Sequence, residues 1–341
     1  MTRPKSIPPV LRCPRCRSAI ERDVDPLQCA NGHVVPALGT ILDCRGVIAG
    51  FDVEADRGLA EELLAMGEAT FEELLRHYWS RQVDVAAPLA ERFVHGDLIG
   101  LDRATAVVDQ IEELLGGPLE EGAVVLEIGA GTAALGAAIA LRAGHVVATD
   151  ISLAWLTLAA RRLTDEGIEN VTLVACTADR LPFASGEFDL VVAADVIEHV
   201  PDPLAMARSC YHVVRPGGAL WLSTPNRLSL TPEPHVRVWG VGLMPRPWGR
   251  RLVRRVRGVP YDVHTHSVFE LRRTLGATGG AVRVSAPAIA PALRAGYRPT
   301  ARLLIGAYHV ARELPVARSA LLGVTPLFHA TVEKRKTARS G

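Results

Sequence analysis

The strongest constraint on the fold is the alternation of short β-rich runs with helical runs between residues 122 and 226. Such alternation predicts βαβ units and a parallel sheet that binds ligands at the carboxyl ends of its strands. The chain has 341 residues, of which 48% are hydrophobic, so its length suffices for a buried core. This composition excludes a disordered, collagenous or disulfide-scaffold protein. The five strand candidates are AVVLEIG, HVVATD, VTLVAC, DLVVAAD and ALWLST.

A glycine-rich turn, EIGAGT at residues 127–132, follows the first strand candidate and precedes a helical run. Glycines let the backbone approach a ligand closely, and a helix N-terminus carries a partial positive charge. The second strand candidate ends at Asp150, where an acid can accept hydrogen bonds from ribose hydroxyls. Ala134 stands where dinucleotide-binding turns usually have their last glycine, which disfavours NAD. A turn that packs a helix and binds no cofactor is the alternative.

Taken together, the motifs of this block resemble those of class I S-adenosylmethionine-dependent methyltransferases. The matching segments are VLEIGAGTA, TDIS, TADRLPFASGEFDLVVAADVIEHVPDP and VVRPGGALWLSTPN. The resemblance implies a Rossmann-like α/β fold and S-adenosylmethionine as cofactor, and Ala133 replaces a glycine found in many members. The residues that it assigns to the cofactor are Glu127, Gly129, Ala130 and Gly131 at the methionine end, Asp150 at the ribose, Ile151 against the adenine, Asp179 and Leu181 near the adenine amino group, and Asp195 beside the methyl group.

The run Asp195-Val-Ile-Glu198-His199 follows the fourth strand candidate. With the later STPN, it most resembles O-methyltransferases of the ubiquinone-biosynthesis type. In some of these, the corresponding acid, Glu and His hold a divalent metal near the acceptor, which implies a metal near Glu198 and His199. If the turn is helical, the three side chains share one face, with His199 as the candidate base and the acids as support. Alternatively the pair orients the turn only, and Asn226 either faces the acceptor or fixes its own turn.

A second strong pattern is Cys13-x2-Cys16-x12-Cys29-x3-His33. Three Cys and one His on two tight knuckles predict a closed, tetrahedral and therefore structural zinc site, with coincidence as the alternative. Cys44 is an alternative fourth ligand, whereas Cys176 and Cys210 fit the core. The spacing matches the zinc module of a family of ribosomal RNA guanine methyltransferases. The following VVPALGTILDC looks more like small zinc ribbons attached to other methyltransferases.

The net charge of +1 conceals two halves of opposite sign. Residues 227–341 contain 20 Lys and Arg against 5 Asp and Glu, and seven Arg lie between Glu233 and Asp262 with no acid among them. Arginine suits phosphate or carboxylate, and class I methyltransferases insert acceptor-binding elements at this place. We therefore expect an anionic acceptor, RNA or an anionic membrane surface here. A solvated arginine face that balances the acidic half is the alternative. His235 is a candidate pocket wall.

These patterns predict an organisation in three parts. They are a zinc-ribbon-like module at 1–50, a helical linker at 51–117, and a methyltransferase domain at 118–341 with acceptor-binding insertions at 227–265 and 288–325. The first ten residues lack the apolar core of a signal peptide, and no apolar run approaches the ~18 residues of a membrane span. We therefore expect a cytoplasmic protein without a disulfide framework.

The function that the sequence favours is methyl transfer from S-adenosylmethionine to an oxygen of a small-molecule or glycan-like biosynthetic acceptor. The first alternative is a ribosomal or transfer RNA methyltransferase that grips RNA with the zinc ribbon and the arginines. Aromatic residues among the arginines are few, which disfavours a platform for single-stranded RNA. A non-catalytic partner with a degenerate cofactor site is the third hypothesis, and the intact set from Glu127 to Asp179 argues against it.

Overall fold

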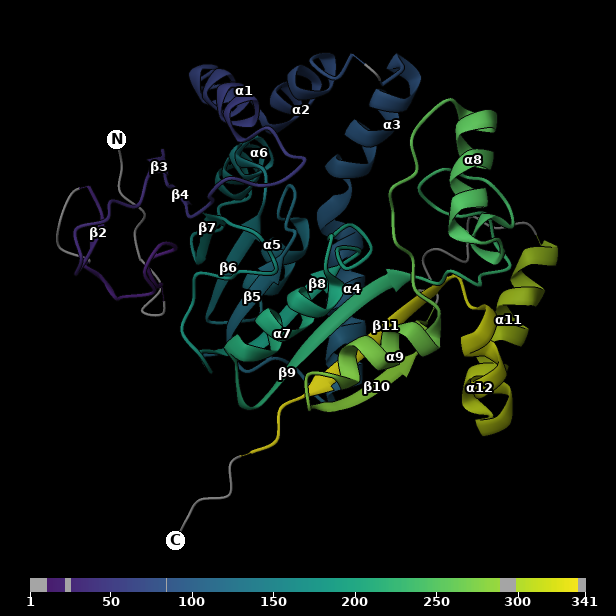
Figure 1. Cartoon of the computed structure of the whole chain (residues 1–341). Helices are drawn as coiled ribbons and strands as arrows, with labels where there is room; N and C mark the ends of the chain where they lie inside the picture. Colours follow the sequence, from purple (N-terminus) through teal and green to yellow (C-terminus); the bar gives the residue numbers. More distant parts are fainter. Residues whose placement is uncertain (1–10, 22–25, 84, 289–298, 337–341) are drawn as a thin grey trace, which may run out of the picture. The chain divides into compact units, whose positions relative to one another are not determined.

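The structure is a computed structural model, which describes residues 11–21, 26–83, 85–288 and 299–336 (Figure 1). Contacts between Cα atoms divide the chain into two compact units. Unit 1 comprises Met1–Val192 with His212–Gly218, and unit 2 comprises Ala193–Tyr211 with Ala219–Gly341. The first ten residues and positions 289–298 of the predicted second insertion lie outside the described residues. The three-part division stays a prediction.

Unit 1 is built on a mostly parallel sheet with the strand order β8-β5-β6-β7-β4-β3. The pairs β5–β6, β6–β7 and β7–β4 are parallel, and the edge pair β4–β3 is antiparallel. The strands are β3 (Ala37–Leu38), β4 (Ile41–Asp43), β5 (Val124–Ile128), β6 (His145–Asp150), β7 (Val171–Ala175) and β8 (Phe188–Ala194). Their residues are largely apolar and buried, as expected for a parallel sheet covered on both faces. The predicted parallel sheet is confirmed.

Six helices are described in unit 1, and four of them cover the stretch predicted as a helical linker (Figure 1). They are α1 (Val53–Ala65), α2 (Phe71–Ser80), α3 (Ala87–Leu98), α4 (Gly100–Leu115), α5 (Ala134–Ala140) and α6 (Leu153–Asp165). Local signals set their ends: Thr70 and Glu73 form a capping box on α2, and α4 ends at Gly116, whose φ of 86° suits glycine. Leu63 of α1, Leu75 of α2 and Leu156 of α6 share one buried core.

The N-terminal residues of unit 1 add two features that the β-rich runs do not predict. Strands β1 (Ile20–Glu21) and β2 (Gln28–Cys29) form a small antiparallel hairpin. Strand β4 then joins the main sheet beside β7, with Leu42 opposite Val174. The cysteine-rich region is thus hydrogen-bonded into the same sheet as the glycine-rich turn.

In unit 2 the strand order is β9-β11-β10, and β11 pairs antiparallel with both of its neighbours. The elements are α7 (Pro203–Val213), β9 (Val214–Pro225), the 3-10 helix η1 (Val241–Leu243), α8 (Arg246–Arg257), α9 (Val268–Gly276), β10 (Ala281–Ser285), α11 (Pro299–Glu313), α12 (Pro315–Val324) and β11 (Leu327–Glu333). Strand β9 and helix α7 begin in one unit and end in the other. In the described part of the chain, no helix is both long and apolar enough to span a bilayer.

Candidate functional site

The glycine-rich turn after β5 is tied directly to the end of β6. Gly129 and Gly131 adopt left-handed φ values of 68° and 52°, which a side chain would disfavour. The Gly131 N–H donates to Asp150 Oδ2 at 2.8 Å, and the Ala130 N–H donates to the Thr149 carbonyl. Ala133 also has a positive φ, of 54°, where it caps α5. The structure therefore brings together the turn and the acid that the sequence assigns to one cofactor.

Glu127, in β5, is a buried carboxylate with an unused oxygen. It is 3% exposed, and its Oε2 has no hydrogen-bond partner among the described residues. Burial, with a smaller contribution from the Asp150 charge, raises the pKa of Glu127 to about 8. Gly136 of α5 faces this carboxylate, and a Cβ at that position would overlap Oε2. An orphaned buried carboxylate in a glycine-lined space fits a cationic ligand group such as an ammonium.

Two other predicted cofactor residues, Asp179 and Leu181, lie in the loop after β7, which starts next to Asp150. The Cys176 N–H donates to the Asp150 carbonyl at 2.9 Å, so this loop starts at the same edge of the sheet. Asp179 is exposed in a turn, whereas Leu181 is 2% exposed and packs inward. Ile151 is partly buried directly after β6. The positions fit the predicted roles, which stay predictions.

Asp195, Glu198 and His199 do not lie on one helical face. Residues 197–199 form a turn, and α7 starts only at Pro203, so the condition for a shared helical face is not met. The backbone reverses at Asp195, whose φ is 54°. Asp195 Oδ1 accepts a hydrogen bond from Ser223 Oγ at 2.9 Å and is outside the group that surrounds His199.

Glu198 and His199 instead meet His235, a residue that the sequence offers only as a candidate pocket wall. One ligand atom from each side chain lies within 4.8 Å of the others, and the two imidazole rings are 4.9 Å apart. We call these three residues the open group. His235 comes from the segment after β9, so no local spacing in the sequence connects it to His199. The one sequence feature that could have pointed to it is its position two residues after Glu233.

Neighbouring side chains hold the open group in place. Thr224 Oγ1 donates to Glu198 Oε2 at 3.0 Å, while Glu198 Oε1 is buried without a partner among the described residues. Glu233 Oε1 lies 2.6 Å from His235 Nδ1, which leaves Nε2 for another partner. Burial lowers the pKa of His199, so its imidazole is neutral near pH 7. A carboxylate and two imidazoles with an open side suit a divalent metal or a proton acceptor.

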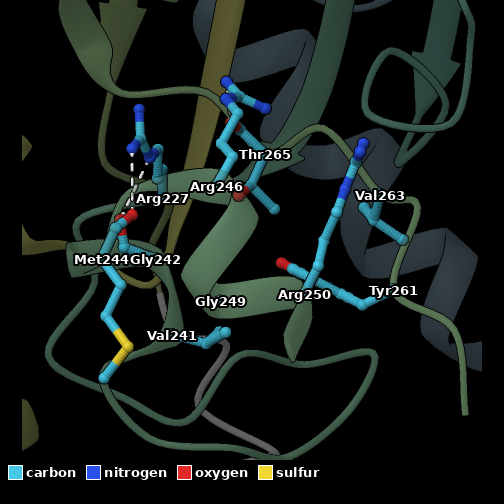
Figure 2. Close-up of a pocket in the computed structure, with 10 residues that line it drawn as sticks. All are labelled: Arg227, Val241, Gly242, Met244, Arg246, Gly249, Arg250, Tyr261, Val263 and Thr265. Atoms are coloured by element: carbon cyan, nitrogen blue, oxygen red, sulfur yellow. Dashed lines mark hydrogen bonds between the residues drawn. The ribbon is translucent and has the colours of Figure 1, made fainter. Parts of the chain in front are cut away.

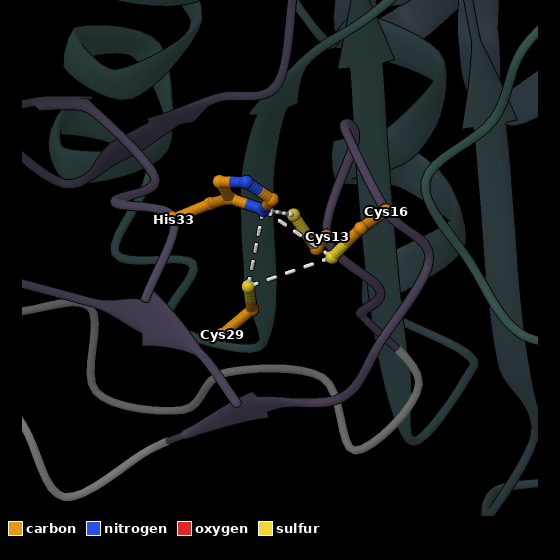
Figure 3. A group of neighbouring side chains, drawn as sticks. All are labelled: Cys13, Cys16, Cys29 and His33. Atoms are coloured by element: carbon orange, nitrogen blue, oxygen red, sulfur yellow. Dashed lines mark hydrogen bonds between the residues drawn. The ribbon is translucent and has the colours of Figure 1, made fainter. Parts of the chain in front are cut away.

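The predicted zinc ligands Cys13, Cys16, Cys29 and His33 converge on one point (Figure 3). The distances between Sγ and Nδ1 atoms are 3.3 Å for Cys16–His33, 3.6 Å for Cys29–His33 and Cys16–Cys29, and 3.7 Å for Cys13–His33. A tetrahedral zinc with Zn–S bonds of about 2.3 Å separates its ligands by about 3.8 Å. We call these four residues the closed group. The four distances between their ligand atoms that are given above are close to this value.

The other cysteines stay outside the closed group. Within the closed group, hydrogen bonds with Ser18 and, to a smaller extent, with Asn31 lower the pKa of Cys16 to about 5, which favours the thiolate. Cys44 follows β4, where its N–H donates to the Ala175 carbonyl, and burial raises the pKa of its thiol to about 12. Cys176 and Cys210 are buried, as predicted.

Some arginines of unit 2 hydrogen-bond backbone carbonyls, whereas others, which we call the free arginines, have exposed side chains without such a bond to any described residue. Arg227 donates to the carbonyls of Gly242 and Met244, and Arg246 donates to that of Thr265, around a pocket of about 20 Å³ (Figure 2). That volume has room for about one water molecule, not for an acceptor. Arg257 holds two further carbonyls. The exposed side chains of Arg251, Arg254 and Arg255 in α8 make no hydrogen bond or ion pair within the described ranges.

Comparison with known proteins assigns the central block. Residues 126–222 match the family profile described as a methyltransferase domain. The chain carries a class I methyltransferase domain. A ubiquinone biosynthesis O-methyltransferase from Xylella fastidiosa is 35% identical over 106 residues, which are 31% of this chain and 43% of the relative. One of the same description from Pseudomonas aeruginosa is 33% identical over 160 residues, which are 47% and 62%.

Solved structures of methyltransferases align over more of the chain at lower identity. Phosphoethanolamine N-methyltransferase 2 from Haemonchus contortus, in complex with S-adenosyl-L-methionine, has a TM-score of 0.46 and 16% identity over 69% of this chain and 53% of that one. An S-adenosylmethionine-dependent methyltransferase from Mesorhizobium loti has a TM-score of 0.46 and 18% identity over 66% and 96%. The chain spans about half the length of the curated relatives it matches.

Proposed function

We propose that this methyltransferase domain transfers a methyl group from S-adenosylmethionine to an oxygen of a small-molecule or glycan-like biosynthetic acceptor. The observation that carries the proposal is the open group directly after β8, in which a neutral His199 lies beside a buried carboxylate. Partial similarity to ubiquinone biosynthesis O-methyltransferases supports oxygen as the accepting atom.

The cofactor residues would act by binding and orientation. When bound, S-adenosylmethionine supplies an activated methyl group, so alignment and exclusion of water are the main demands on the protein. Glu127 Oε2 is free to accept from the ammonium of the methionine part, and the resulting charge pair would lower its pKa again. Asp150, held by the Gly131 N–H, would accept hydrogen bonds from the ribose hydroxyls. Gly129, Ala130, Ile151, Asp179 and Leu181 would shape the remaining walls.

His199 would remove the acceptor proton, because its lowered pKa keeps one ring nitrogen unprotonated at neutral pH. Glu198 would orient or stabilise the imidazolium, and Asp195 would support the turn through its bond to Ser223. The same donor set fits a divalent metal: Glu198, His199 and His235 would hold it and leave a position for an acceptor oxygen. An acceptor hydroxyl bound at that position would have a lower pKa because of the charge of the metal.

The closed group would hold structural zinc, since four protein ligands leave no site for a substrate. We further propose that the free arginines of α8 contact an anionic partner. Arg251 and Arg255 lie on the outer face of the helix next to Trp248, which is 64% exposed. Arginine beside an exposed indole suits an anionic lipid surface.

Calorimetry with S-adenosylhomocysteine tests the cofactor proposal, and labelled methyl transfer to a panel of phenols, glycans and tRNA tests the acceptor class. We expect micromolar binding of S-adenosylhomocysteine and oxygen methylation of a small acceptor. Absence of binding would overturn the enzymatic proposal.

The second candidate is RNA methylation, favoured by the closed group and the free arginines. RNA binding would weaken steeply with salt, because each phosphate contact releases counterions. Absence of RNA binding at low salt rejects this alternative. The double variant Arg251→Ala and Arg255→Ala should weaken RNA binding if these two arginines contact the RNA.

A further inference from the structure

The knuckle of the closed group contacts the core of unit 1 through Arg17. The Arg17 N–H donates to the Cys13 carbonyl at 2.9 Å, and φ is 63°, so the residue sits in a tight left-handed turn. Its guanidinium reaches away from the cysteines and donates to the carbonyls of Leu181 at 2.6 Å and Phe183 at 3.2 Å. The Arg12 N–H donates to the Pro182 carbonyl between them.

The segment that Arg17 holds is the end of the loop after β7. This loop begins at Cys176, whose N–H donates to the Asp150 carbonyl, so it lies at the carboxyl edge of the parallel sheet. Ligands of such sheets bind at that edge. Leu181 and Phe183 are 2% and 0% exposed, which anchors the end of the loop, while Asp179 stays exposed.

A second contact holds the neighbouring loop after β6. Arg45, which follows β4, has a fully buried side chain that pairs with Asp43 at 2.9 Å and Asp56 at 2.6 Å. It also donates to the Ile151 carbonyl at 3.0 Å, and Asp56 accepts from the Leu153 N–H at 2.8 Å. Residues next to the closed group thus support two adjacent loops at the ligand-binding edge.

We propose that the N-terminal metal module is a positioning element of the cofactor site and that Arg17 is the positioning residue that connects the two. The inference rests on the proposed function, namely zinc at the closed group and S-adenosylmethionine at the sheet edge. Because the bound metal fixes the knuckle that carries Arg17, metal and cofactor binding are coupled. Coupling of this kind is reciprocal, so the cofactor also stabilises the bound metal.

Arg15 provides a matched control for Arg17. Both arginines are exposed residues of the same knuckle, but Arg15 makes no side-chain hydrogen bond with the described residues. We expect Arg17→Ala to weaken S-adenosylhomocysteine binding about tenfold in calorimetry, as loss of a charge-assisted hydrogen bond predicts. Arg15→Ala leaves the dissociation constant unchanged, and both variants keep their zinc. Arg17→Lys, which can reach one carbonyl, restores part of the affinity.

Zinc release gives a readout that does not depend on turnover. In the wild-type chain, saturating S-adenosylhomocysteine slows transfer of zinc to a coloured chelator several-fold, and in Arg17→Ala this protection is lost. Wild-type binding by Arg17→Ala, or equal protection in both chains, overturns the inference while the proposed function stands. A wild-type chain that binds no S-adenosylhomocysteine fails the proposed function instead. An Arg17→Ala chain with reduced zinc content or a lower melting temperature fails the inference, because its role is then structural.

Discussion

The closed group of unit 1 and the open group of unit 2 each bring potential metal ligands together, but the two groups differ in the number and kind of ligand atoms that they offer. The closed group offers three sulfurs and one nitrogen at the spacing of a filled tetrahedron. The open group offers one carboxylate and two imidazoles, with an unused carboxylate oxygen. A metal in the first is saturated, whereas a metal in the second has room for an exchangeable oxygen.

The surroundings of the two groups differ in the same sense. Ser18 and Asn31 donate hydrogen bonds toward a closed-group sulfur, which stabilises a thiolate. In the open group, Glu233 fixes His235 and Thr224 fixes Glu198, so the ligands are oriented while their other atoms remain available. The comparison indicates that the number and orientation of the ligands, and not the proximity of donors alone, would separate a structural metal site from a reactive one.

The largest effect should come from opening the closed group. Cys29→Ser removes one thiolate, so we expect loss of zinc and a drop of several kcal/mol in the free energy of unfolding, because metal binding and folding of such modules are linked. Metal analysis and chemical unfolding measure both. Cys44→Ser, at a buried thiol outside the group, is the control and should retain zinc. Retention of zinc by Cys29→Ser would refute the assignment.

The next largest effect should come from the open group during catalysis. His199→Ala should lower turnover by about 10²- to 10⁴-fold, the usual contribution of a general base. Labelled methyl transfer measures the rate, and calorimetry should show unchanged affinity for S-adenosylhomocysteine. An unaltered rate would make His199 a structural residue and remove the main contrast between the groups.

A pH series tests the buried carboxylate of the open group. Burial, followed by the Asp195 charge, raises the pKa of Glu198 from 4.5 to about 7. A raised pKa stabilises the fold below pH 4.5, and this contribution is lost as the pH rises through 7. Without added divalent metal, the free energy of unfolding of the wild type should fall by about 3 kcal/mol as the pH rises from 4.5 to 7. Glu198→Gln should flatten the curve, and identical slopes in the two chains would exclude the shift.

The smallest effect should come from the residue that orients His235. Glu233→Gln should weaken divalent-metal binding at the open group about tenfold, at the lower end of what residues that hydrogen-bond and orient metal ligands contribute. Titration with manganese, followed by its paramagnetic signal, measures the affinity. Zinc in the closed group should be unaffected. If His235→Ala binds manganese like the wild type, His235 is not a ligand and the open group reduces to a hydrogen-bonded turn.

Local signals made the closed group and most of the sheet predictable. Cys13 and Cys16 share one knuckle, as do Cys29 and His33, so their spacing alone predicts convergence. The β-rich runs predicted β5 to β9 because each contains at least five residues that are mostly apolar or β-branched. The same reasoning could not find β4, which has only three residues and depends on its partner β7 for its conformation.

The open group was only half predictable for a related reason. Glu198 and His199 are adjacent and follow a strand, but His235 reaches them through a fold of the segment after β9 that has no sequence period. Residues 195–199 do not share a helical face, because the chain bends after β8 at Asp195, whose φ is left-handed. Contacts made by Arg17 and Arg45 are likewise long-range and leave no pattern in the sequence.

Strand β4 has a consequence for any attempt to shorten this protein. It occupies the side of β7 that would otherwise present unpaired N–H and C=O groups, and the two-residue strand β3 ends the sheet beyond it. Short terminal strands discourage chains from joining edge to edge. A chain that starts after residue 50 would uncover β7, an apolar strand of a parallel sheet, and should self-associate. The segment that contains β3 and β4 should therefore also protect the protein from aggregation, whether or not a ligand is bound.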